Sequence, residues 1–105
     1  MKRKQTIEKS LTPNVSDERV GGIAVSLAGH DKGTILVIVA GLDEKHVLVA
    51  DGKRRVLEAP KKKQMRHLRI FTKLSEQDTE SLSERKINDS FLRKKLSGFD
   101  LAGFT

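Results

Sequence analysis

The sequence predicts a mainly β protein, a small barrel of four or five antiparallel strands with a short C-terminal helix and a flexible N-terminal arm. Three observations favour this class: short apolar runs with the period of a strand, glycine-containing turns between them, and chain ends without any strand pattern. A chain of 105 residues accommodates one small domain and its tails. We therefore expect an arm over residues 1–19, a barrel over residues 20–72, and a linker with a helical tail over residues 73–105.

The first expected hairpin has an alternating first strand and a β-branched second strand. In the first strand, large apolar residues alternate with small or polar ones, as in a half-buried strand, at Ile23, Val25 and Leu27. Residues 34–39 are rich in β-branched side chains and form the second expected strand. Between them lie residues that adopt positive φ or hydrogen-bond within their own turn, namely Gly29, Asp31 and Gly33.

Two or three further strands are expected after this hairpin. Residues 46–50 form the third strand, and the dipeptide Asp51-Gly52 after it is a strong signal for a two-residue hairpin turn. Residues 53–57 are then expected as a fourth strand, which the following proline ends because it lacks the N–H of a sheet ladder. A fifth strand is expected around residues 67–71. Closure of these strands into a barrel would remove exposed sheet edges.

The chain beyond the barrel is expected to be a polar linker followed by a helix. Residues 72–80 are polar and show no apolar period. Asn88 is a suitable helix N-cap, and the lysines before the next glycine favour the negative end of a helix dipole. We expect a helix over residues 89–97. Because Ser81 and Glu84 also fit a capping box, an earlier start of the helix stays open.

The positive charge of the chain is concentrated in one segment. The whole chain has a formal charge of +7, whereas residues 20–52 carry a net −2 and residues 70–105 carry none. Residues 53–69 alone carry eight basic side chains and a single acidic one, Glu58, so this basic segment has a net charge of +7. Such a segment suits a polyanionic partner: a nucleic acid, an anionic membrane or an acidic protein.

Several other classes of function are not supported by the sequence. The chain has no cysteine, so disulfides and cysteine-ligated zinc are excluded, and a reducing, cytoplasmic location is expected. No apolar run approaches the length of a membrane span. The glycine turn lacks the Gly-Lys-Ser/Thr ending of a phosphate-binding loop. We expect no catalytic residue, cofactor or metal, since the histidines are scattered at His30, His46 and His67.

Residues 22–39, GIAVSLAGHDKGTILVIV, resemble a KOW motif, with Gly29 and Gly33 at the turn. The continuation HVLVADGKRR over residues 46–55, followed by a later His-Leu pair, is similar to KOW-containing ribosomal large-subunit proteins. These are the eukaryotic and archaeal fourteen, six and twenty-seven group, whose bacterial relatives are small RNA-binding proteins. The resemblance covers residues 20–70. It implies an SH3-like barrel that contacts RNA, often ribosomal RNA, without catalytic activity.

The basic residues are the expected RNA contacts, because their side chains can pair with phosphate oxygens. They are Lys32, Lys53, Arg54, Arg55, Lys61, Lys62, Lys63, Arg66 and Arg69. For His30 and its neighbours at the hairpin tip, RNA contact and simple turn chemistry are equally good interpretations. Because the four phenylalanines lie outside the first four strands, we expect contacts to phosphate and groove shape rather than stacked bases.

Two alternatives to an RNA-binding function stay open at this point. A run of basic residues can be a solvated loop that contributes only solubility. The domain could also dock an acidic surface of a transcription or translation factor, and the C-terminal helix could hold a protein partner. Binding to an anionic membrane is disfavoured, because the basic segment lacks the interleaved aromatic and leucine residues of an interfacial helix.

Overall fold

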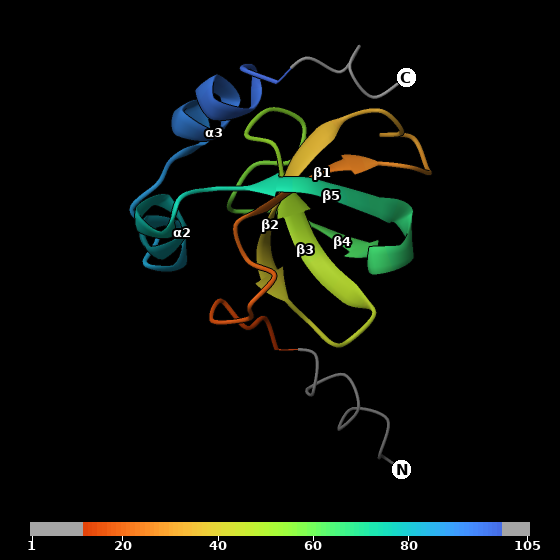
Figure 1. Cartoon of the computed structure of the whole chain (residues 1–105), viewed down its shortest axis with the longest axis horizontal. Helices are drawn as coiled ribbons and strands as arrows, with labels where there is room; N and C mark the ends of the chain where they lie inside the picture. The colour runs from red at the N-terminus through yellow and green to blue at the C-terminus, as the bar shows by residue number, and fades with distance from the viewer. Residues whose placement is uncertain (1–11, 100–105) are drawn as a thin grey trace.

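The computed structural model describes residues 12–99, which form one antiparallel sheet with two helices packed on it (Figure 1). The five strands lie in the order β4-β3-β2-β1-β5. The elements in chain order are β1 (Gly22–Ser26), β2 (Ile35–Gly41), β3 (His46–Ala50), β4 (Lys61–Gln64), the 3-10 turn η1 (Met65–His67), β5 (Leu68–Lys73), α2 (Glu76–Ser83) and α3 (Asp89–Leu96). The prediction of a mainly β protein with antiparallel strands is confirmed.

The sheet is open, because β4 and β5 do not pair with each other and form its two edges in the described part of the chain. β2 is the central strand, and β1 beside it pairs with β2 on one side and with the edge strand β5 on the other. The register shifts between Ile23 and Ala24 in β1, and again between Ile38 and Ala40 in β2. Such bulges bend and twist a strand, so the sheet curves instead of lying flat.

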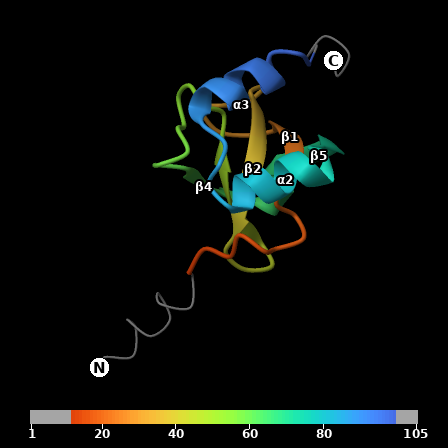
Figure 2. The same ribbon diagram turned by 90° about the vertical axis from the view of Figure 1, so that its left-hand side faces the viewer.

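Both faces of β1 are buried, which corrects the expectation of a half-buried first strand. All five residues of β1 are buried. One face carries a cluster of apolar residues from the strands alone: Ala24, Leu36, Ile38, Val47, Val49 and Leu68. The other face carries Ile23, Ile35 and Val37, which pack with leucines of α2 and α3 (Figure 2). The helices therefore cover one face of the sheet, and its curvature encloses the other.

The expected fourth strand over residues 53–57 is wrong, because the chain forms an irregular loop there. The carboxylate of Asp51 accepts hydrogen bonds from the backbone N–H groups of Lys53 and Arg55, at 2.8 and 2.9 Å. These bonds close the backbone into a local turn, so the segment does not return along β3. The fourth strand begins only at Lys61, where β4 pairs with β3 in the register of Val49 with Lys61.

The helical tail contains one helix that was expected and one that was missed. α3 begins after Asn88, whose side chain accepts a hydrogen bond from Phe91 N at 2.8 Å, so the expected N-cap is confirmed. α2 occupies much of the expected linker and begins after Ser75, whose hydroxyl accepts from Asp78 N. The sequence of α2 shows no apolar period, because Leu82 is the one buried residue of this helix. Ser81 and Glu84 lie at the end of α2, so the earlier start of the last helix is also wrong.

Candidate nucleic-acid interface

The strand register places the β1–β2 hairpin tip and the loop after β3 at the same end of the sheet. β2 runs away from the tip, and Val37 near its start pairs with Ala50 at the end of β3. β4 then starts beside Val49 and leads away from the same end. We call this end, with the tip at residues 28–33 and the loop at residues 51–57, the basic end. Lys32 and the first part of the basic segment therefore lie at the same end of the sheet, with the tip held against β4 and the loop held against α3.

The loop at residues 51–57, called the basic loop below, presents three exposed cations: Lys53, Arg54 and Arg55. None of the three belongs to an ion pair within residues 12–99. The turn needs Gly52, which has a φ of +78° that other residues rarely adopt. Asp51 and Gly52 both belong to this turn, but it leads into a loop and is not the two-residue hairpin turn into a strand that the sequence predicts.

Helix α3 packs directly against the basic loop. Asp89 Oδ1 accepts a hydrogen bond from Leu57 N at 2.8 Å, and Arg93 Nη1 donates to Gly52 O at 2.7 Å. A Cβ on Gly52 would lie 2.5 Å from the carbonyl oxygen of Asp89, so the two backbones are in close contact. The helix also adds the exposed Arg93 to the cations of the loop. Sequence reasoning missed Arg93, because its neighbour in the fold lies 41 residues away.

Lys63 is buried and paired, so it is not an accessible RNA contact. The residue is 6 % exposed. Its Nζ lies 2.6 Å from Asp31 Oδ1 and donates to Ala28 O at 2.9 Å. Because side chains alternate along a strand, Lys62 points to the opposite side and is exposed. Lys63 therefore connects β4 to the hairpin tip. The sequence does not reveal this structural role, because Lys63 is one of three consecutive lysines.

Asp31 is a partly buried anchor of the hairpin tip as well as a turn residue. Its Oδ1 also accepts a hydrogen bond from Ser26 Oγ at 2.8 Å, and its Oδ2 lies 3.5 Å from Lys61 Nζ. Burial alone would raise the pKa of this carboxyl, but hydrogen bonds from Lys63 and Ser26 and the nearby lysine charges lower the pKa to about 2. Asp31 is thus ionised at neutral pH and neutralises part of the charge of β4.

The remaining predicted contacts lie on the surface in several places. At the hairpin tip, His30 and Lys32 are exposed, and Gly29 and Gly33 have the expected positive φ of 89°. Lys61 is partly covered, with 27 % of its side chain exposed. Arg66 in η1 and Arg69 in β5 are both exposed. The structure therefore separates the basic segment into a loop, a strand and a turn, and leaves most of its cations accessible.

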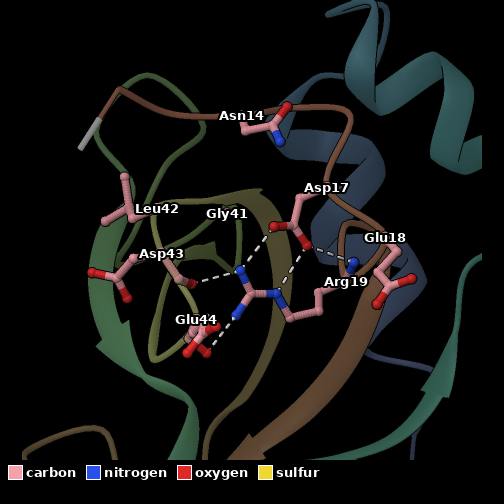
Figure 3. A pocket seen from close by; sticks show the side chains of 8 residues that line it. All are labelled: Asn14, Asp17, Glu18, Arg19, Gly41, Leu42, Asp43 and Glu44. Carbon is pink, nitrogen blue, oxygen red and sulfur yellow. Dashed lines mark hydrogen bonds and ion pairs between the residues drawn. The ribbon is translucent and has the colours of Figure 1, made fainter. Parts of the chain in front are cut away.

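The opposite end of β3, called the acidic end below, carries four carboxylates, those of Asp17, Glu18, Asp43 and Glu44. It also carries Arg19 and the exposed Lys45, and η1 with the predicted contact Arg66 adjoins it, since Met65 N donates to Lys45 O at 2.7 Å. There, Arg19 is held by Asp17 at 2.8 Å and also donates to the carbonyl oxygens of Asp43 and Glu44 (Figure 3). The side-chain hydrogen bond from Arg19 outweighs burial and lowers the pKa of Asp17 to about 2. Gly41 lies so close to the Asp17 carboxylate that a Cβ there would overlap it. The one arginine of this site is fully occupied, whereas the carboxylates of Glu18, Asp43 and Glu44 are exposed.

Residues 12–19 form part of this acidic end, although they belong to the segment expected as a flexible arm. The backbones of Asn14 and Gly41 exchange two hydrogen bonds, at 2.8 and 2.9 Å. The hydroxyl of Ser83 in α2 also donates to Val15 O at 3.0 Å. The described part of the expected arm thus pairs with β2 and contacts α2. The first 11 residues of the expected arm lie outside the described residues.

A groove of about 800 Å³ lies on the helical side of the molecule. Its lining includes Val15, Leu48, Leu57, Pro60 and Ile87. Within residues 12–99, no group of three or more His, Asp or Glu side chains converges as a metal site would require. No helix in this part of the chain is long and apolar enough to cross a bilayer. The groove is lined by apolar residues together with the charged residues Glu58, Arg85 and Asp89.

Comparisons with known proteins do not assign the chain to a family. No protein-family model matches it. No curated protein sequence matches it either. The geometry and charge of the basic end are therefore the observations on which a proposal of function depends.

Proposed function

We propose that this chain is a non-catalytic RNA-binding protein that contacts the phosphate backbone of structured RNA through its basic end. The observation that carries the proposal is the separation of charge along β3. Three cations without an ion-pair partner in residues 12–99 follow the strand, and a cluster of carboxylates precedes it. A five-residue strand spans roughly 15 Å, so these two surfaces face different surroundings. A polyanion is attracted to one end and repelled by the other.

The fold supports an SH3-like barrel, which the KOW resemblance implies. The strand order of the described residues is β4-β3-β2-β1-β5, with the 3-10 turn η1 between the two edge strands. The register shifts in β1 and β2 are the bends that strands need in order to curl into a barrel. The resemblance also makes ribosomal RNA, on or near the ribosome in the cytoplasm, the first RNA to test.

The proposal includes how the RNA is contacted. The basic end carries arginine, lysine and histidine, and residues 12–99 place Phe71, Phe91 and Phe99 against the helical core and not on the basic end. Stacking platforms for single-stranded bases need exposed aromatics. The partner is therefore folded RNA, and the protein contacts its phosphates and recognises the shape of its groove. With about four phosphates contacted, the slope of log affinity against log salt should be near −3.

Charge reversal tests the proposal. Arg54→Glu combined with Arg55→Glu should weaken binding to a ribosomal RNA fragment by more than about tenfold, measured by filter retention at constant salt. The matched control is Lys45→Glu combined with Lys86→Glu, which changes the net charge equally but lies away from the basic end. It should leave the affinity within about twofold. Equal losses in both pairs would show nonspecific attraction to total charge and would contradict the proposal.

A second experiment separates RNA from a protein partner. The protein is recovered from cells after crosslinking, and the attached RNA is sequenced. Recovery of ribosomal RNA would support the proposal. If partners survive nuclease treatment and no RNA is recovered, the molecule instead docks an acidic protein surface. The apolar groove beside the basic loop is the feature that would favour this alternative.

A further inference from the structure

We propose that α3 is a brace for the RNA-binding loop, and that Asp89 acts as a positioning residue although its charge has the wrong sign for RNA. This inference depends on the proposed function and names the residues that prepare its site. The basic loop has its own turn bonds, in which Asp51 N and Gly52 N donate to Arg55 O at 2.9 and 3.0 Å, but within residues 12–99 no strand pairs with it. Its turn must therefore be held against the rest of the molecule if its cations are to meet phosphates without a large ordering cost.

The contacts between α3 and the loop lie at both ends of the exposed cations. Arg93 holds the loop before Lys53, through the carbonyl oxygen of Gly52. Asp89 holds it after Arg55, through the amide of Leu57. The three exposed cations therefore lie on a short bridge with both ends attached to one helix. α3 is itself anchored in the core, because Leu92 is fully buried and Leu96 is 8 % exposed.

Asp89 provides a test because its charge and its hydrogen bond predict opposite effects. By charge alone, removal of this carboxylate beside a cationic loop should tighten binding to RNA. By position, removal of the acceptor releases Leu57 N and loosens the loop, which should weaken binding. Asp89→Ala and Asp89→Asn both remove one negative charge. Only the asparagine retains an oxygen that can accept from Leu57 N.

The expected result is a separation of these two variants in RNA affinity. Asp89→Ala should bind the ribosomal RNA fragment about three- to tenfold more weakly than the wild type at the same salt. Asp89→Asn should bind as tightly as the wild type or more tightly. The salt slope should be the same in all three proteins, because no phosphate contact is removed. Glu58→Ala, an acid removed from the same segment, is the control for charge and should not weaken binding.

Gly52→Ala provides a second test that changes no charge. The added Cβ would lie 2.5 Å from Asp89 O and 3.0 Å from Leu92 Cβ, so the loop must move away from α3. This variant should also lose affinity with an unchanged salt slope. Thermal unfolding in the absence of RNA shows whether each variant is folded at the binding temperature. If Asp89→Ala does not fold, the brace is tested by the other two variants: Gly52→Ala should lose RNA affinity, and Asp89→Asn should not.

Failure of the inference and failure of the proposed function give different results. If the wild type does not bind RNA, both are overturned. If the wild type binds RNA but Asp89→Ala binds as tightly as Asp89→Asn, only the brace is overturned. Equal weakening of both Asp89 variants would also overturn it, since retention of an acceptor oxygen in Asp89→Asn would then make no difference. Wild-type affinity in folded Gly52→Ala would contradict the brace as well.

Discussion

The two ends of β3 use charged side chains in opposite ways. At the acidic end, Arg19 is enclosed by Asp17 and two carbonyl oxygens, so it holds the segment before β1 against the β2–β3 turn. At the basic end, the loop cations have no acidic partner among residues 12–99, and the carboxylate of Asp51 accepts hydrogen bonds from backbone N–H groups instead. The arginine of the acidic end therefore stabilises the fold, whereas the cations of the basic loop are left available for a ligand.

Lys63 shows that this contrast also exists within the basic segment itself. Lys62 and Lys63 are neighbours of the same type, but one is exposed and the other is buried against Asp31. The alternation of a strand decides which of them faces the hairpin tip. A count of basic residues therefore overstates the RNA surface. Four experiments test the difference between structural and available charges, starting with the largest expected effect.

Removal of the buried lysine should have the largest effect on stability. Lys63→Ala leaves the carboxylate of Asp31 without its 2.6 Å partner, which should lower the free energy of unfolding by about 3 kcal/mol. Urea denaturation measures this change. The control is Lys62→Ala on the exposed side of the same strand, which should cost less than about 0.5 kcal/mol. Similar losses in the two variants would show that Lys63 is not structural.

Removal of the enclosed arginine should have the next largest effect. Arg19→Ala removes the partner of Asp17 and leaves two carbonyl oxygens of the β2–β3 turn without their donor. We expect a loss of about 2 kcal/mol in the free energy of unfolding, with RNA affinity unchanged at a temperature where the variant is folded. A loss of RNA affinity in the folded variant would show that the acidic end takes part in binding.

Acid should destabilise both ends through their structural carboxylates. The pKa values of Asp17 and Asp31 fall from the ordinary 3.8 to about 2 on folding. Their ionised forms therefore stabilise the fold above about pH 4, and this contribution is lost as the pH falls through about 2. Urea denaturation between pH 5 and pH 2 should show the decline. The decline should be smaller in Asp31→Asn, and an equal decline in this variant would contradict the assignment to Asp31.

Removal of one available cation should have the smallest effect. Lys32 at the hairpin tip is exposed and outside the ion pairs of residues 12–99. Lys32→Ala should therefore not change stability measurably, but it should weaken RNA binding a few-fold and reduce the salt slope by about 0.8. Lys45→Ala at the acidic end is the control and should leave both values unchanged. An unchanged slope in Lys32→Ala would remove the hairpin tip from the interface.

Much of the fold could be predicted from local pattern. The hairpin at residues 22–39, the third strand and the capped helix α3 each depend on neighbouring residues, such as paired glycines or Asn88 before its helix. α2 was missed because it is held by a single buried leucine, Leu82, within a polar sequence. The sequence predicts a strand at residues 53–57 because Asp51-Gly52 is a typical hairpin turn. The same dipeptide can also begin an irregular loop, as it does in the structure.

Local sequence alone accounts for the strands, the turns and the concentration of charge after β3, because each depends on residues a few positions apart. Only the packed chain decides which charges a ligand can reach. Asp31 meets Lys63 across 32 residues, and Asp89 meets Leu57 across the same separation. Such pairs form when strands and helices pack side by side. The number of residues between the two partners does not predict that they will be in contact. The basic segment therefore becomes a braced loop and a buried anchor only in the folded molecule.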